Sequence, residues 1–226
     1  MNFFQTLLYW DAQGVLALNR LHTPALDRLA WLLSDTLLWV PAAAVFLYVL
    51  IKNKRSAAVP VLLALALMIV FADQISSSFI KPLVGRLRPT RNMELIPFLD
   101  IVSGYRGGRF GFLSSHAANV FAFAVFTALL FRSRPYSWFI YLWALLIALS
   151  RVYLAVHYPL DVLAGICLGV LSGILFYRLL SLFLVKPFKG DRQFTLTQFL
   201  RRDIALLIFT LLLTLTLLCL AAWRLP

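Results

Sequence analysis

Long runs of apolar residues, separated by short polar segments, dominate this sequence. A helix needs about 20 apolar residues to cross the roughly 30 Å hydrocarbon core of a bilayer, and several segments reach or approach that length. In chain order these segments are residues 29–51, 57–79, 112–131, 138–156, 160–185 and 204–223. We therefore predict an all-α polytopic membrane protein with six transmembrane helices, forming a single domain over residues 1–226.

The composition supports that prediction. The chain is 62% hydrophobic and 13% charged, whereas soluble domains are about half apolar and a quarter charged. The N-terminal segment, residues 1–14, lacks the basic region and the Ala-x-Ala site of a cleavable signal peptide. Its aromatic and leucine side chains favour a short interfacial helix. Cys167 and Cys219 lie in apolar runs without metal-ligand spacing, and we expect both to be small buried hydrophobes.

The net charge of +12 is spread over the connections between apolar runs. There it sets the topology and attracts anionic lipid, so we expect membrane lipids as partners and no nucleic acid. The connections after the first, third and fifth runs are basic, which places them in the cytoplasm by the positive-inside rule. The opposite face then holds both termini and residues 80–111. That segment is basic too, and its arginines either bind an anionic head group or solvate the loop: Arg86, Arg91, Arg106 and Arg109.

Three polar clusters fall at the ends of predicted spans, all on this opposite face. Because each cluster follows or precedes a helix, packing of the helices can bring the clusters together. Lys81 and Arg88 belong to the first cluster, Ser114, Ser115 and His116 to the second, and Arg151, His157 and Asp161 to the third.

The residue types in these clusters suit a phosphate dianion. Lys81, Arg88 and Arg151 supply positive charge, and an arginine also offers two parallel N–H donors. Ser114 and Ser115 precede a predicted helix, where free backbone N–H groups and hydroxyls bind anionic oxygens. These five side chains are our candidate phosphate-binding residues.

Two histidines and a carboxylate complete a candidate catalytic set. Asp161 lies four residues after His157, so its carboxylate can bind one ring N–H and leave the other nitrogen free to attack phosphorus. His116 can donate a proton to the leaving oxygen. The sequence has no Asp, Glu or His cluster with the spacing of a Mg²⁺ or Zn²⁺ site, and we expect neither a metal nor a cofactor.

The combined pattern Lys-x6-Arg-Pro, Ser-x-His and Ser-Arg-x5-His-x3-Asp resembles the type 2 phosphatidic acid phosphatase (PAP2) family of membrane lipid phosphatases. The resemblance implies a phosphohistidine intermediate on His157, supported by Asp161, with His116 as the acid. It also matches Lys81, Arg88, Ser114 and Arg151 to phosphate-binding positions. The family usually has Pro-Ser-Gly-His where this chain has Leu-Ser-Ser-His at residues 113–116. The second serine keeps the backbone donor, and we interpret the change as benign.

The resemblance implies hydrolysis of a lipid phosphate or pyrophosphate. We favour undecaprenyl pyrophosphate, because short loops leave little structure for a bulky saccharide; lipid A and phosphatidylglycerophosphate stay open. Transfer of the phosphoryl group to a lipid sugar is an enzymatic alternative, and a lipid transporter or scaffold is a non-enzymatic one. We expect the protein in the inner membrane with its site on the periplasmic side.

Four other features of the sequence lead to expectations about single residues. Asp73 and Gln74 lie about two helical turns before Lys81 and are candidate partners for it. Asp35 falls within the first predicted span without an evident partner. His22 is expected at the surface. Tryptophans near span ends suit anchoring at the membrane interface, namely Trp10, Trp39 and Trp223.

Overall fold

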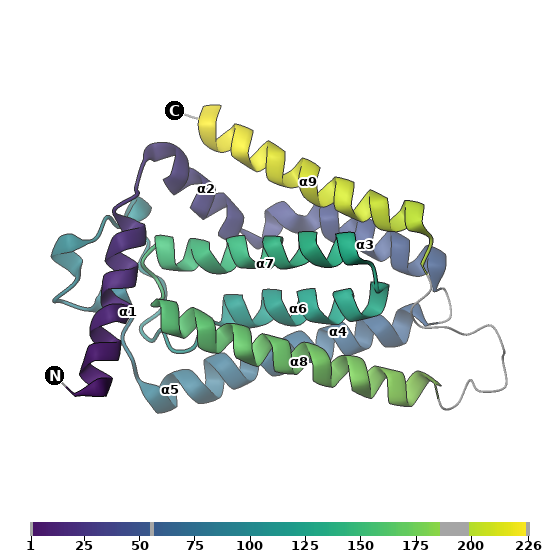
Figure 1. Cartoon of the computed structure of the whole chain (residues 1–226), viewed down its shortest axis with the longest axis horizontal. Coiled ribbons are helices and arrows are strands. Elements are labelled where there is room, and N and C mark those ends of the chain that lie inside the picture. Colours follow the sequence, from purple (N-terminus) through teal and green to yellow (C-terminus); the bar gives the residue numbers. More distant parts are fainter. Residues whose placement is uncertain (1, 55–56, 186–198, 225–226) are drawn as a thin grey trace.

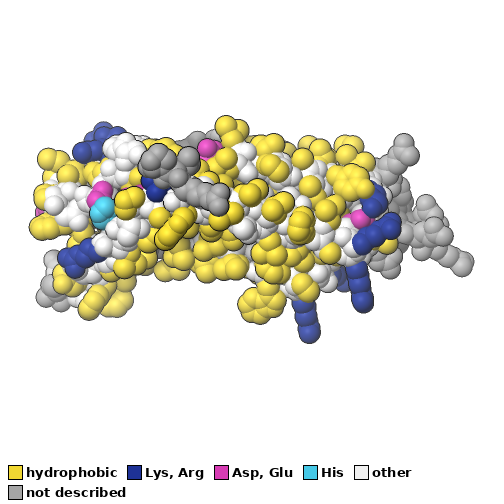
Figure 2. All heavy atoms as spheres, turned by 90° about the horizontal axis from the view of Figure 1, so that it is seen from above, with side chains coloured by type: hydrophobic (Ala, Val, Ile, Leu, Met, Phe, Trp, Pro, Cys, Tyr) yellow, Lys and Arg dark blue, Asp and Glu magenta, His cyan; other side chains and the backbone are white. Residues whose placement is uncertain are grey.

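The computed structural model describes residues 2–54, 57–185 and 199–224. Its long helices lie side by side in an elongated bundle, and a further helix, α1, crosses one end (Figure 1). Hydrophobic side chains cover the middle of the bundle, whereas most charged side chains gather at its two ends (Figure 2). This distribution fits a bundle whose long axis crosses a membrane. Four basic residues of the predicted cytoplasmic connections lie outside the described residues: Arg55, Lys186, Lys189 and Arg192.

The described residues form helices and no strands, which confirms the all-α polytopic class. The main helices are α1 (Phe3–Asn19), α2 (Pro24–Ser34), η1 (Thr36–Trp39), α3 (Val40–Asn53), α4 (Ala58–Asp73), η2 (Gln74–Ile80), α5 (Lys81–Val84), α6 (Ser115–Phe131), α7 (Arg134–Tyr153), α8 (Pro159–Val185) and α9 (Arg201–Arg224). Three short turns lie between α5 and α6: η3 (Pro89–Arg91), η4 (Ile96–Phe98) and η5 (Val102–Gly104).

Five helical stretches of the described chain are long and apolar enough to cross a membrane. They are Thr36–Asn53, Ala58–Val84, Arg134–Tyr153, Pro159–Phe183 and Arg201–Trp223. The remaining predicted span corresponds to α6, an apolar helix of 17 residues. It begins at Ser115 rather than at residue 112, because the Ser114 side chain caps its first turn.

The first predicted span is wrong at its start. Instead of one helix over residues 29–51, α2 ends at Ser34 and the crossing stretch begins at Thr36. Asp35 separates them with an extended backbone (φ −80°, ψ 115°), and its Oδ1 accepts the Leu37 N–H at 2.9 Å. An aspartate favours such a capping position over a helix interior because it satisfies a free backbone donor. The side chain without an evident partner in the sequence is therefore a helix cap.

The helices α6 and α8 pack backbone to backbone, and this contact sets the position of the site. A Cβ atom added to Gly165 or Gly169 would lie 2.4 Å from the carbonyl oxygen of Ser114 or Ala118, respectively. One added to Gly173 would lie 2.8 Å from a carbonyl oxygen of α6. Small residues at a spacing of four let membrane helices approach this closely. As a result the first turn of α6 lies beside the first turn of α8.

The N-terminal helix is longer than the predicted interfacial segment. It runs from Phe3 to Asn19 across the end of the bundle (Figure 1). Phe3, Phe4 and Trp10 are exposed, which agrees with contact with a membrane surface, but Asp11 and Val15 are buried. One face of α1 is thus packed into the protein rather than resting on lipid.

Both cysteine expectations are wrong. Cys167 on α8 and Cys219 on α9 are exposed on the outer faces of their helices. The outer side chains of a membrane bundle are apolar because they face lipid, so an apolar run does not imply burial inside the protein.

Trp39 is not an interfacial anchor. Its side chain is buried, its Nε1 donates to the carbonyl oxygen of Leu33 at 3.2 Å, and its ring meets that of Trp143 edge to face at 5.4 Å. Trp10 and Trp223, by contrast, are exposed.

Candidate functional site

The three polar clusters meet at the end of the bundle that α1 crosses (Figure 1). Here α5 ends, α6 and α8 begin, and α7 ends, with residues 85–114 folded over the meeting point. The charges of Lys81, Arg88 and Arg151 all act on the ring of His157. The structure therefore brings the predicted residues into one neighbourhood from four separate helices.

His157 lies in the short turn between α7 and α8 and is almost fully buried, as is Asp161. Nδ1 of His157 lies 3.6 Å from Oδ2 of Asp161 and has no hydrogen-bond partner. The carboxylate thus faces the predicted ring nitrogen, but from beyond hydrogen-bond distance. Burial lowers the pKa of His157 well below its usual value, and the charges of Arg88 and Arg151 act in the same direction. The ring is therefore neutral at pH 7, as a nucleophile requires.

Arg88 and Arg151 are buried cations held by few acceptors. Nε of Arg88 donates to the carbonyl oxygen of Phe110 at 3.1 Å, and its Nη1 donates to that of Val156 at 3.2 Å. Nη2 of Arg151 donates to the Tyr105 hydroxyl at 3.3 Å, while its buried Nε has no partner. No carboxylate pairs with either guanidinium among the ion pairs of the described residues. Unneutralised, partly unpaired cations in a buried site suit an anionic ligand.

Lys81 points toward the start of α6. Its Nζ donates to Oγ of Ser115 at 3.0 Å and to Oγ of Ser77 at 3.2 Å. The Ser77 hydroxyl donates in turn to Asp73 at 3.4 Å. Asp73 therefore supports Lys81 through a serine, whereas Gln74 accepts from Ser78 instead.

The predicted anion-binding serines lie at the start of α6. Ser114 is the N-cap, its Oγ accepts the Ala117 N–H at 3.4 Å, and its own N–H donates to the carbonyl oxygen of Asp161 at 2.9 Å. Ser115 and His116 are the first two residues of the helix, where backbone N–H groups lack intrahelical acceptors.

Sequence reasoning missed Asp11 and the role of Arg86. Nη1 of Arg86 donates to Oδ1 of Asp161 at 2.8 Å, and its Nη2 donates to Oδ2 of Asp11 at 2.6 Å. Oδ1 of Asp11 accepts the Leu160 N–H at 2.8 Å. Burial raises the pKa of the Asp11 carboxyl, and the bonds from Leu160 and Arg86 oppose that rise. Two carboxylates thus hold Arg86, while its partly exposed side chain also lines a surface pocket between α1 and the loop.

The other loop arginines contact the loop itself. Arg91 donates to the carbonyl oxygen of Gly107 at 3.2 Å, and Arg106 donates to that of Thr90 at 3.4 Å. Arg109 lies over the ring of Phe110 at 5.3 Å. His22 is half exposed, as expected, and its two ring nitrogens lie within 3.2 Å of Asp27 and 3.0 Å of Asp100.

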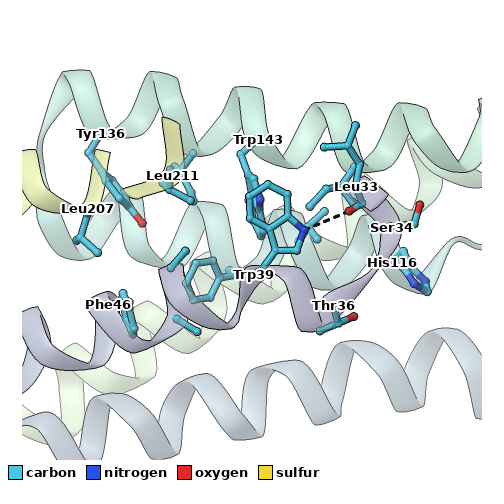
Figure 3. A pocket seen from close by; sticks show the side chains of 16 residues that line it. Leu33, Ser34, Thr36, Trp39, Phe46, His116, Tyr136, Trp143, Leu207 and Leu211 are labelled. Carbon is cyan, nitrogen blue, oxygen red and sulfur yellow. Dashed lines mark hydrogen bonds between the residues drawn. The ribbon is translucent and has the colours of Figure 1, made fainter. Parts of the chain in front are cut away.

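Two cavities reach His116. An apolar cavity of about 230 Å³ extends from His116 between α3, α6, α7 and α9, with Trp39 and Trp143 on its walls (Figure 3). A second pocket, of about 180 Å³, shares His116 and Ser34 with it. The other residues that line this second pocket are Trp31, Asp35, Tyr105 and Arg151. The site thus joins a polar pocket to an apolar one, which is the arrangement an amphiphile requires.

Comparisons with known proteins agree with this geometry. Residues 57–184 match the model of the PAP2 superfamily. The chain is 45% identical over 169 residues, 74% of its length and 75% of the relative's, to a lipid A 4′-phosphatase of Bacteroides thetaiotaomicron. It is 37% identical over 164 residues, 72% of its length and 70% of the relative's, to a lipid A 4′-phosphatase of Porphyromonas gingivalis. It is 35% identical over 77 residues, 34% of its length and 38% of the relative's, to the undecaprenyl-diphosphatase BcrC of Bacillus subtilis. No solved structure matches the chain.

Proposed function

The chain belongs to the PAP2 superfamily of membrane lipid phosphatases, and from that premise we propose that it hydrolyses the 4′-phosphate of lipid A. The relatives that share about three quarters of its length carry that activity in their names. The sequence analysis favoured undecaprenyl pyrophosphate instead, which only the shorter match to BcrC supports. The lipid A reading, an alternative there, is the better supported one.

The polar pocket beside His116 is the structural observation that favours a sugar head group. Asp35 and Ser34 offer hydrogen-bonding oxygens there, and Trp31 and Tyr105 offer aromatic faces. These oxygens already bond to Leu37, Ala30 and Ser150, and a prenyl pyrophosphate has no polar group beyond its phosphates that could use their remaining acceptor capacity. A glycolipid has hydroxyl and amide groups that can bind them.

In the proposed reaction, Lys81, Arg88 and Arg151 hold the phosphate oxygens. A ring nitrogen of His157 attacks phosphorus with its lone pair, and the bond from phosphorus to the sugar oxygen breaks. His116 gives that oxygen its proton, and Asp161 stabilises the positive charge that develops on the His157 ring. Water, deprotonated by His116, then displaces the imidazole and releases inorganic phosphate. The apolar cavity that leaves His116 would hold an alkyl chain of the lipid.

We place the site on the periplasmic side of the inner membrane. The support comes from the opposite end of the bundle, where α3 ends and α9 begins (Figure 1). Its basic residues, together with those between α6 and α7, make it the cytoplasmic end by the positive-inside rule: Lys52, Lys54, Arg132, Arg134, Arg201 and Arg202.

The test is phosphate release by purified protein in the presence of EDTA. The substrates are lipid A species phosphorylated only at the 4′ position or only at the 1 position, phosphatidylglycerophosphate and undecaprenyl pyrophosphate. We expect the 4′-phosphorylated species to give the highest kcat/KM. His157→Gln should lower kcat at least roughly 1000-fold, whereas His22→Gln, a change of the same type at an exposed site, should not. Full activity of the His157 variant would exclude the mechanism, and preference for another lipid would exclude the substrate.

Undecaprenyl pyrophosphate is the second candidate, supported by the match to BcrC. Asp35→Asn separates the two substrates, because the amide keeps the oxygen that caps η1 but removes the charge from the polar pocket. For a sugar head group we expect kcat/KM to fall about tenfold. For a prenyl pyrophosphate we expect no change. Equal effects on both lipids would show that the polar pocket does not select the head group.

A further inference from the structure

We propose that Arg86 and Asp11 are positioning residues of the catalytic centre. Helix α1, which carries Asp11, thereby contributes to catalysis. The inference rests on the proposed role of His157 as nucleophile. It extends the site beyond residues 57–184, the part of the chain that matches the family, because Asp11 lies on the N-terminal helix.

Arg86 bridges two carboxylates rather than facing the phosphate site. One terminal nitrogen donates to Asp161 at 2.8 Å and the other donates to Asp11 at 2.6 Å. The face of the guanidinium stacks on the ring of Tyr158, 3.7 Å from its centroid. With both ends and one face engaged, Arg86 is held in one orientation and is not available as a phosphate clamp.

Asp161 depends on this bridge. Its side chain is wholly inaccessible to solvent, and a buried carboxylate is stable as an anion only when it is paired and hydrogen-bonded. Arg86 pairs with Oδ1, and the Tyr158 N–H donates to Oδ2 at 3.0 Å. Oδ2 is also the oxygen that faces His157, at 3.6 Å from Nδ1. The bonds from Arg86 and Tyr158 therefore fix both the charge and the direction of the group that supports the nucleophile.

Asp11 holds the other end of the bridge and also the start of α8. Its Oδ1 accepts the N–H of Leu160, the second residue of α8. A carboxylate at a helix N-terminus satisfies a free donor and is stabilised by the helix dipole. One turn further along α1, a Cβ atom on Gly14 would lie 2.8 Å from Cγ of Pro159. Helix α1 is thus fitted against the segment that carries His157 and Asp161.

The charges of the bridge suit the chemistry on the ring. Asp11 and Asp161 together with Arg86 carry a net charge of −1, and Asp161 is the member of the bridge that faces the imidazole, at 3.6 Å. Lys81, Arg88 and Arg151 supply the positive charges of the phosphate site. When the ring bonds to phosphorus it gains positive charge, which the net negative charge of the bridge stabilises. Removal of Asp11 would leave the bridge neutral without touching the phosphate site.

The first test separates kcat from KM. Because neither residue contacts the phosphate, we expect Arg86→Gln to lower kcat roughly 100-fold and Asp11→Asn roughly 10-fold, with KM within about threefold of the wild type. The burst of phosphohistidine formation, measured by rapid quench, should slow by the same factors. If the two residues act through one bridge, the double variant should be no slower than Arg86→Gln. A large rise in KM for Arg86→Gln would instead make it a phosphate ligand and overturn the proposal.

The matched control is Asp203→Asn, which removes a buried, paired carboxylate at the opposite end of the bundle. It should leave kcat unchanged. Chemical rescue gives a second readout, since guanidinium ions added to Arg86→Ala should restore kcat at least tenfold, while methylammonium should not. Variants as active as the wild type would overturn the inference, and so would losses that guanidinium does not rescue. A wild-type protein that releases no phosphate from any lipid of the panel would overturn the proposed function itself.

Discussion

The two ends of the bundle both carry charge but use it differently. At the end where α3 ends and α9 begins, Lys52 and Asn53 donate to the two oxygens of Asp203 at 2.7 and 2.8 Å, and they tie α3 to α9. At the end that carries the candidate site, Arg88 and Arg151 are buried without a carboxylate partner among the described ion pairs. Charges that neutralise one another hold helices together. Buried cations without a carboxylate partner favour the binding of an anionic ligand.

Arg151 should show the largest difference between the ends. Its Nε is buried without a partner, so it can bind a phosphate oxygen without breaking an existing bond. We expect Arg151→Gln to lower kcat/KM about 1000-fold. Arg151→Lys, which keeps the charge but loses the planar pair of donors, should lower it about 100-fold. Arg202→Gln, at an exposed arginine of the other end, should have no effect. Steady-state kinetics on one lipid measure these changes. Equal losses of kcat/KM in Arg151→Gln and Arg202→Gln would show that the two ends do not differ in this way.

Two glycines near the candidate site, Gly111 and Gly108, should differ in their tolerance of a side chain. A Cβ atom on Gly111 would lie 2.8 Å from Oδ2 of Asp161, whereas one on Gly108 would be 4.0 Å from its nearest neighbour. Gly111→Ala should displace the carboxylate and lower kcat about 10- to 100-fold, with Gly108→Ala close to the wild type. The same assay measures both. A harmless Gly111→Ala would mean that the position of Asp161 tolerates a shift.

Asp203 should show the converse behaviour. Because its bonds join α3 to α9, Asp203→Asn should lower the midpoint of thermal unfolding in detergent by a few degrees and leave kcat/KM within about twofold. Arg151→Gln should do the opposite, with little loss of thermal stability. A loss of activity in Asp203→Asn would show that the two ends are coupled.

The smallest effect concerns protonation. Since the folded-state pKa of His157 lies below that of the unfolded chain, neutral His157 should persist below pH 6.5, and acidification below that point should favour the unfolded state. The ring carbon chemical shifts of His157, followed as the pH falls from 7.5 through 6.5, should stay those of a neutral imidazole. A His157 signal that titrates near pH 6.5 would contradict this environment.

The apolar pattern predicted the long helices because membrane thickness requires each span to be a long apolar run. Four of the predicted runs correspond to α4 with its extension, α7, α8 and α9 within a few residues. The predicted start of the first run was wrong, because Asp35 caps a new helix there with a hydrogen bond that hydropathy does not register. The cysteines failed because apolar patterning does not distinguish lipid-facing from buried positions.

The candidate site residues were predicted from fixed spacings near span ends, and the structure brings those clusters together. The contact between Arg86 and Asp11 was not predicted, because it joins residues 75 positions apart in the sequence. In a membrane protein a loop arginine also resembles a topology signal. The one charged residue of an otherwise uncharged N-terminal helix was the signal available, since a buried carboxylate on such a helix needs a cation.

The length of α6 has a kinetic consequence. Its 17 residues span about 26 Å, less than the roughly 30 Å of hydrocarbon in a bilayer, so the candidate site residues at its start lie near the level of lipid head groups. A substrate reaches them by lateral diffusion and never dissolves in water. The KM of the enzyme is then a surface density of substrate in the membrane rather than a concentration in solution. Diluting the substrate with inert lipid should slow turnover, whereas diluting the whole suspension with buffer should not.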